Sequence, residues 1–296
     1  MDKNDDGKIS RAEFEVAVLK LAKEMNMYEE VAQVKQPVKR VTIPAAPKIT
    51  PLAGDNALTF RDGLRDMGKT FNNARHAFLT LSINEKSLSN LDGIDSFKYL
   101  QNVYVAGNGL KDLKCLSVLK HLVRLDASEN QITNMLDFEP PACLDWVDYS
   151  HNQISKIENV NLNPYLKELY FDDNQIEVIE GLKENPNLRV LSMNSNRIKV
   201  IQNLEGMYLS KLYLRQNHLK SITGLDNLPV LSTLDLSKNQ IVKLRGLEQI
   251  ESLRFLNLSL NQVYKVRQLR YIEQLPLLTE LEFCFNPIMD KKLYRL

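Results

Sequence analysis

The sequence is poor in the residues that build metal centres, disulfides and redox sites. Its 296 residues include three cysteines and four histidines. Three scattered cysteines are too few for a disulfide framework, so we expect a reducing compartment. The histidines show none of the spacings of metal ligands, and no nucleophile has an identifiable partner base. The sequence therefore predicts a protein that is not an enzyme.

An excess of charge of one sign is also missing. Lys and Arg together number 38 and Asp and Glu 37, and this balance argues against nucleic-acid binding, which needs a basic surface. No apolar run approaches the roughly 20 residues of a membrane helix, and the polar, acidic start is unlike a secretory signal. We therefore expect a cytoplasmic protein whose partners are proteins, with no nucleic acid, membrane or small-molecule substrate.

Leucine and asparagine, by contrast, are abundant, with 47 and 27 residues. Both follow the frame L-x-x-x-x-N-x-I, as in 125–132, and the Asn recurs every 22 residues apart from one gap of 21 and one of 25. The Asn positions are Asn108, Asn130, Asn152, Asn174, Asn196, Asn217, Asn239, Asn261 and Asn286. An atypical first unit has Lys86 in the Asn slot, as expected of a capping repeat. About ten repeats therefore occupy residues 79–296.

The spacing predicts the structure of one unit. A short strand, such as 212–214, points its apolar residues inward, and the Asn side chain bonds backbone groups of adjacent turns. The second half, such as 176–182, is predicted to pack as a helical or 3₁₀ segment on the convex side. Ten strands at about 4.8 Å spacing make a concave strip roughly 45 Å long.

This pattern resembles the leucine-rich repeat. Its 22-residue form, with I-x-x-I-x-x-L after the Asn as in 154–160, is similar to the subfamily of the phosphatase-1 regulatory repeat protein and the axonemal dynein leucine-rich light chain. The resemblance implies an α/β solenoid, a right-handed superhelix of about ten repeats with a parallel concave sheet. The segment 286–288 resembles that subfamily's C-terminal cap motif, which normally continues, so we expect the sequence to be truncated at Leu296.

Two narrower resemblances point to cilia. Short motifs over 58–77 resemble the ciliary radial-spoke leucine-rich repeat protein, and the stretch 115–152 resembles the leucine-rich repeat and guanylate kinase protein, associated with cilia and sperm tails. The insertion at 271–276, which explains the 25-residue gap, is similar to both. These resemblances imply a place in the axoneme, although this chain has no guanylate kinase domain.

Residues 1–30 are predicted to be a partial EF-hand, a small helical arm. The segment 2–13 fits D-x-[DN]-x-[DN]-G-x5-E, whose spacing supplies the oxygen ligands that Ca²⁺ prefers. The predicted ligands are Asp2, Asn4, Asp6, Lys8 through its carbonyl, Ser10 and bidentate Glu13. The entering helix and a second loop are not in the sequence, so an acidic, disordered or helix-capping tail is the alternative.

Residues 31–56 are a Pro-rich basic linker, either a tether or a strap on a neighbouring protein. Residues 57–78 are predicted to form an amphipathic cap helix over the first repeat, with Leu58, Leu64, Met67 and Phe71 on its apolar face. Within it, 63–70 satisfies the P-loop pattern G-x-x-x-x-G-K-[ST]. A P-loop needs a buried strand before it and a parallel sheet around it, so we expect no nucleotide site.

The concave strip is the predicted functional surface, because its residues alternate with the buried leucines. The candidate partner-binding residues are Tyr104, Asp126, Trp146, Asp148, Glu168, Tyr170, Asp172, Tyr213, Arg215 and Phe255. Aromatic residues among charges are typical of interfaces, since Trp, Tyr and Arg dominate binding energy. The acidic stretch from Asp148 to Asp173 predicts a partner that is partly basic.

Together these features predict a non-enzymatic interaction scaffold of the ciliary or flagellar axoneme, in a radial spoke or another microtubule-associated complex. The calcium loop would make it calcium-responsive. The alternative is a regulatory subunit of a serine/threonine protein phosphatase. A nucleotide-binding enzyme is a third interpretation, and it depends on 63–70 alone.

Overall fold

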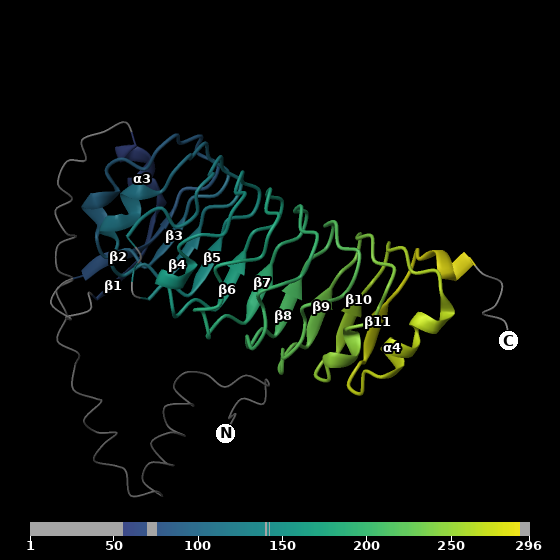
Figure 1. Cartoon of the computed structure of the whole chain (residues 1–296). Helices are drawn as coiled ribbons and strands as arrows, with labels where there is room; N and C mark the ends of the chain where they lie inside the picture. The colour runs from purple at the N-terminus through teal and green to yellow at the C-terminus, as the bar shows by residue number, and fades with distance from the viewer. Residues whose placement is uncertain (1–55, 70–75, 140, 142, 291–296) are drawn as a thin grey trace, which may run out of the picture. The chain divides into compact units, whose positions relative to one another are not determined.

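A computed structural model provides the fold, and it describes residues 56–69, 76–139, 141 and 143–290. The predicted calcium loop, its exiting helix and nearly all of the linker lie outside these residues. Eleven strands form one sheet in the order of the chain (Figure 1). Among the described residues, no helix is long and apolar enough to cross a membrane.

Ten of the strands are parallel and in register, which confirms the predicted parallel sheet. Each strand pairs with the equivalent residues of the next repeat, so that Leu125 is opposite Val147 and Val147 is opposite Leu169. The parallel strands are β2 (His76–Ser82), β3 (Asn102–Tyr104), β4 (Arg124–Asp126), β5 (Trp146–Asp148), β6 (Glu168–Tyr170), β7 (Val190–Ser192), β8 (Lys211–Tyr213), β9 (Thr233–Asp235), β10 (Phe255–Asn257) and β11 (Glu280–Glu282).

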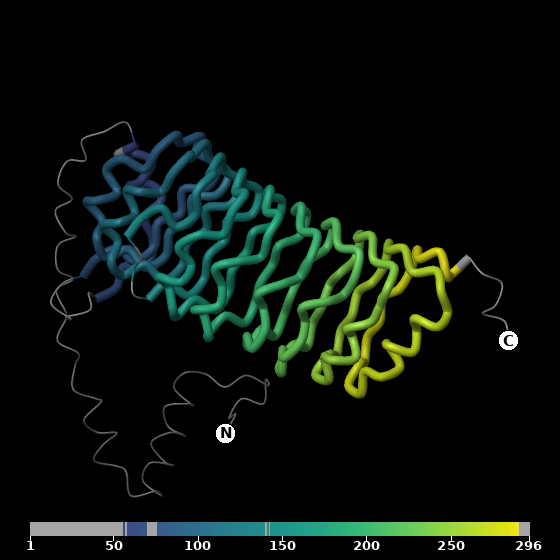
Figure 2. Tube along the Cα trace, in the orientation of Figure 1, coloured from purple at the N-terminus to yellow at the C-terminus, as the bar shows by residue number. Residues whose placement is uncertain are grey.

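Return segments carry the chain from the end of one strand to the start of the next (Figure 2). Several contain a short helical turn: η1 (Ile94–Phe97), η2 (Lys114–Val118), η3 (Val160–Leu162), η4 (Leu247–Gln249), η5 (Val266–Gln268) and α4 (Arg270–Glu273), and a further turn, η6 (Pro287–Asp290), follows β11. The prediction was wrong for 176–182, which has no helix. Its β-branched residues and Gly181, at φ +74°, disfavour one. The 25-residue gap accommodates η5 and α4.

The Asn ladder holds adjacent repeats together, as the sequence predicted. Asn152 accepts a hydrogen bond from the Ile132 N–H at 2.9 Å and donates to the Ala127 and Tyr149 carbonyls at 2.9 and 3.0 Å. The same pattern recurs at Asn174. These amides are buried, so each satisfies backbone groups that water cannot reach.

A helix and a hairpin cap the first repeat, which corrects the predicted cap helix. Helix α3 spans only Ala57–Gly63, and Leu64–Lys69 forms strand β1, antiparallel to β2. Pairing with β2 covers the edge of the sheet, which an isolated helix would leave open. Of the predicted apolar cap residues, Leu64 is buried, Leu58 and Met67 are 74% and 47% exposed, and Phe71 lies outside the described residues. Phe60, which was not predicted, is fully buried, with its ring 6.4 Å from that of Phe97.

Candidate functional site

The exposed side of the sheet is formed by the first and third residues of each strand. In β3 to β6, β9 and β10 the central residue is buried and both flanking residues are exposed or half-buried. We call the surface formed by these flanking residues from β3 to β10 the strand face. Parallel pairing lines them up in two columns, which we call the first and the third after their place in the strand.

All ten candidate residues lie on or beside the strand face. Trp146, Glu168 and Phe255 belong to the first column, and Tyr104, Asp126, Asp148, Tyr170 and Tyr213 to the third. Asp172 and Arg215 come two residues after β6 and β8. The structure therefore brings these residues onto one surface, as their alternation with buried residues predicted.

Three strands form an acidic aromatic patch, which we define as Asp126, Trp146, Asp148, Glu168 and Tyr170. The rings of Trp146 and Tyr170 are 5.8 Å apart and tilted by 49°. The Tyr170 hydroxyl donates to Glu168 Oε2 at 2.7 Å. Partial burial, together with this bond and the Glu168 charge, raises the pKa of the Tyr170 phenol. The two aromatic rings are therefore held in place by neighbours within the patch.

The carboxylates on β4 and β5 are hydrogen-bonded within their own repeats. Asp148 accepts from the Ser150 N–H at 2.7 Å. Burial, with a smaller contribution from the charges of Asp126 and Asp172, raises the pKa of Asp148. Asp126 accepts from the Ser128 N–H and hydroxyl at 3.1 and 2.7 Å. The negative charges on β4 and β5 are therefore close enough to disfavour one another.

Asp172 is more firmly fixed. It accepts hydrogen bonds from the Ser192 hydroxyl at 2.6 Å and from the Asn194 N–H and side-chain amide at 2.8 and 3.0 Å. Asn194 in turn accepts from the Arg215 N–H at 2.8 Å. This network joins three repeats, and the sequence prediction missed it because each partner lies some 20 residues away. Asp172 is consequently better placed to brace the face than to take a ligand.

Cations are scarce within the patch. Among the six first- and third-column residues of β4 to β6, Arg124 is the one cation. None of the described ion pairs includes Arg124 or a carboxylate of the patch. Lys167, next to Glu168 in sequence, instead contacts Asp145 at 3.2 Å. The patch therefore presents three carboxylates without a basic partner in the described part of the chain.

The sign of the charge changes further along the strand face. Strand β7 contributes Val190 and buried Ser192, and β8 then contributes Lys211, with exposed Arg215 beyond it. Exposed Lys238 follows β9. The strand face thus passes from acidic and aromatic at β5 to basic at β8.

A second set of exposed aromatic residues lies at the turns before the strands, where the sequence prediction named no site. Tyr99, Tyr165 and Tyr208 are 40%, 59% and 51% exposed. The Tyr99 ring stacks on His121 at 6.2 Å, and Arg189 lies 5.7 Å from the centre of the Tyr208 ring. Their recurrence in one frame of the repeat was the available signal. The Tyr99 and Tyr208 rings therefore already have neighbours within the chain.

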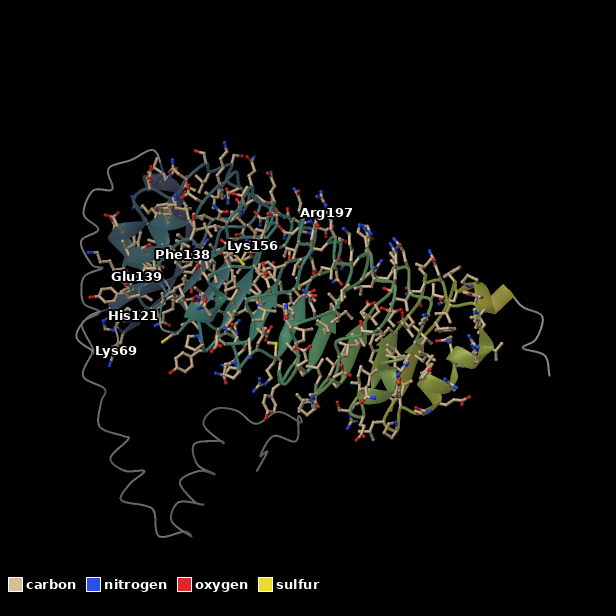
Figure 3. The ribbon with its side chains drawn as sticks, in the orientation of Figure 1. Lys69, His121, Phe138, Glu139, Lys156 and Arg197 are labelled. Carbon is tan, nitrogen blue, oxygen red and sulfur yellow. The ribbon has the colours of Figure 1, made fainter. Side chains whose placement is uncertain are left out.

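The P-loop-like segment does not form a phosphate cradle. Most of it is strand β1, and Lys69 is exposed at the hairpin end of the repeats, where Figure 3 also labels His121 and Glu139. An open pocket of about 400 Å³ lies beside it, with Arg65 in its lining. The Arg65 guanidinium donates to the Asp62 and Leu64 carbonyls at 2.7 and 3.0 Å. The sequence match thus lacks the strand–loop–helix geometry that binds nucleotides.

Other chemistry has little support in the described residues. No group of three His, Cys, Asp or Glu side chains is arranged there to hold a metal ion. Burial, followed by the charges of Asp112 and Asp92, raises the pKa of the Cys115 thiol to about 11. A thiol with so high a pKa is a poor nucleophile at neutral pH. Surface recognition is therefore the chemistry that the described residues support.

Comparisons with known proteins agree with the repeat. The family model described as leucine-rich repeats (2 copies) matches residues 164–206. The chain therefore contains leucine-rich repeats. Its fold is similar to the leucine-rich repeat domain of APL1, with a TM-score of 0.62 and 18% identity over 71% of this chain and 56% of that one. It is also similar in fold to internalin C2 from Listeria monocytogenes, with a TM-score of 0.52 and 23% identity over 69% of this chain and 80% of that one.

Two human proteins share local sequence similarity with this leucine-rich repeat chain. The leucine-rich repeat and guanylate kinase domain-containing protein of Homo sapiens is 36% identical over 78 residues, which are 26% of this chain and 10% of that protein. Leucine-rich repeat-containing protein 23 of Homo sapiens is 34% identical over 83 residues, 28% of this chain and 23% of that protein. The matches thus span less than a quarter of each relative's length.

Proposed function

We propose that this leucine-rich repeat protein is a non-enzymatic scaffold that docks a protein of the ciliary or flagellar axoneme on its strand face. The carrying observation is the acidic aromatic patch, where Trp146 and Tyr170 stand half-exposed on adjacent strands. Trp, Tyr and Arg dominate the binding energy of interfaces. A patch that combines such rings with charges is suited to a protein partner.

The sheet beneath the patch makes docking favourable. Its strands are fixed by backbone pairing and by the buried Asn amides. A surface held in this way loses little conformational entropy on binding, so more of the contact energy appears as affinity.

The axonemal assignment is supported by sequence similarity. The two human relatives are those that the motif resemblances in the sequence pointed to, and these resemblances imply a radial spoke or another microtubule-associated complex. Since only short stretches match, the complex and the partner are part of the proposal.

Calcium responsiveness is a separate element of the proposal. The segment 2–13 carries the full ligand pattern of an EF-hand loop. Calorimetric titration of the full chain with Ca²⁺ should give heat that a Glu13→Gln variant lacks, because Glu13 supplies the bidentate ligand. Equal heats from the two proteins would remove calcium from the account.

The docking proposal is tested by capture from demembranated cilia. Tagged full-length chain should retain axonemal proteins, and a Trp146→Ala/Tyr170→Ala variant should lose them. A Tyr165→Ala/Tyr208→Ala variant, which alters the exposed rings at the turns, is the control and should capture as the wild type does. Equal capture by all three proteins would move the docking site away from the strand face. Capture of a phosphatase alone would contradict the axonemal assignment.

A further inference from the structure

We infer that the acidic aromatic patch binds an arginine side chain presented by a basic, extended segment of the partner. This inference rests on the proposed docking function and adds the chemistry of the contact. Three observations support it: no described cation lies over the Trp146 ring, the carboxylates of the patch have no basic partner among the described ion pairs, and the charge changes sign along the strand face.

The first support is the state of the aromatic rings. Elsewhere in the described chain, Tyr208, Tyr264 and Tyr271 each have a cationic side chain over the ring, at 5.7, 5.1 and 4.7 Å. Trp is the best of the aromatic residues at holding a cation. Nevertheless, no described cation lies over Trp146, the one tryptophan of the sequence. The ring with the strongest preference for a cation therefore has no cation over it within the described residues.

The second support is the position of the carboxylates around that ring. Glu168 is the neighbour of Trp146 in the first column, and Asp148 is two residues along the same strand. A guanidinium that lies flat on an indole still directs its N–H groups outward in its own plane, where carboxylates can accept them. A lysine ammonium cannot stack and fork at the same time, so arginine matches the patch better.

The third support is the charge gradient. The acidic residues lie on β4 to β6, and the basic residues Lys211 and Arg215 lie on and after β8. An extended segment crossing these strands would place its arginine at Trp146 and a neutral or acidic stretch near Lys211. The change of charge between β5 and β8 therefore predicts the order of the basic and the neutral or acidic parts of the segment.

The single tryptophan gives a direct measurement. The fluorescence of Trp146 in the full chain is titrated with a blocked Gly-Ser peptide that carries arginines, and with matched peptides carrying lysine, glutamine or glutamate instead. We expect a saturable change with the arginine peptide at low salt, at least tenfold weaker binding of the lysine peptide, and no change with the other two. Equal responses to the arginine and lysine peptides would overturn the inference.

Isosteric variants then locate the contact. The Asp148→Asn/Glu168→Gln variant keeps the shape of the patch and should weaken binding of the arginine peptide at least tenfold. Glu280→Gln/Glu282→Gln removes the same charge from the same two columns at β11 and should leave its binding unchanged. Arg124→Gln removes the cation that competes with the peptide, so it should tighten binding of the arginine peptide. If the β11 variant weakens binding as much as the patch variant, net charge alone attracts the peptide and the inference fails.

Ciliary capture separates this inference from the docking proposal. Suppose that Trp146→Ala/Tyr170→Ala loses axonemal proteins while Asp148→Asn/Glu168→Gln keeps them. The strand face then remains the docking surface, and the inference of an arginine in the partner is wrong. If both variants lose them and the β11 variant does not, both proposals are supported.

Discussion

Neighbouring residues of one strand are under different structural constraints, because one is buried in the core and the next faces outward. In β5, Val147 is fully buried and has an equivalent Leu or Val in the neighbouring parallel strands, whereas Trp146 and Asp148 are half-buried. The position of Trp146 holds Arg124 and Glu168 in the adjacent repeats, and that of Asp148 holds Asp126 and Tyr170. The inward residues must fit the same space each time and pair the same backbone groups. The outward residues face no such constraint, so their chemistry is free to serve recognition. The inward set accordingly holds the fold, and the outward set carries the proposed function.

The largest expected effect comes from breaking the inward Asn ladder. Asn152→Ala leaves the buried Ile132 N–H without its partner, at roughly 1–3 kcal/mol. It also takes one of two amide donors from the Ala127 and Tyr149 carbonyls, which keep those of Asn130 and Asn174. We expect the free energy of unfolding in urea to fall by about 3 kcal/mol. Asn134→Ala, at an exposed position nearby, is the control and should change it little. A loss as small as that of the control would mean that the ladder does not stabilise the fold.

Removal of a single buried hydroxyl should cause a smaller loss of stability. Tyr149 is fully buried, and its hydroxyl accepts the Leu136 N–H at 3.1 Å. Tyr149→Phe leaves this N–H unpaired, so we expect the urea midpoint to fall by the equivalent of about 1–3 kcal/mol. The same change at Tyr213, half-buried on the outward side, should have almost no effect. Equal losses at the two positions would remove the distinction between the sides.

The aromatic rings on the strand face should matter for docking and little for stability. Trp146→Ala/Tyr170→Ala removes half-buried side chains without exposing the core, so we expect the free energy of unfolding to change by no more than about 1 kcal/mol. Loss of axonemal capture should accompany this small change. A variant that unfolds several kcal/mol more easily would show that these rings are structural.

The smallest expected effect is a pH-dependent gain at Asp148. A carboxyl whose pKa is raised by folding binds its proton more tightly in the folded chain. The free energy of unfolding therefore falls as the pH rises from the unfolded pKa, about 3.9, through the higher folded one.

Asp148→Asn removes this penalty and should raise the urea midpoint at neutral pH. The gain should disappear below pH 3.9, where the wild-type carboxyl is protonated. Asp235→Asn, in the same column on β9, controls for net charge. A loss of stability at neutral pH would contradict the electrostatic reading of the patch.

The sequence predicted the inward side well because the same buried apolar positions and the same Asn recur from repeat to repeat. The period of the Asn residues was enough to predict parallel strands and the ladder. The hairpin was missed because Leu64 and Met67 are spaced as in a helix, and only pairing of Leu64 with Leu81 selects a strand. Tertiary pairing outweighed local pattern there.

The outward side was predicted in position and less well in detail. Alternation with buried residues placed Trp146 and Tyr170 on one face. It did not show that Asp172 is engaged by Ser192 and Asn194 of the next repeat, because such bonds depend on side-chain conformations in neighbouring repeats. The exposed Tyr165 was missed because it lies in a turn, outside the alternation of buried and exposed residues that marks the strands.

The central claim is that the partner contacts the outward residues of β5 and β6. Site-specific photo-crosslinking in ciliary extract tests it most directly, with a benzophenone amino acid in place of Tyr170 or, five residues earlier, of the exposed Tyr165. We expect a discrete crosslinked axonemal protein from position 170 and none from position 165. Crosslinking from position 165 alone would contradict the account and place the interface at the turns.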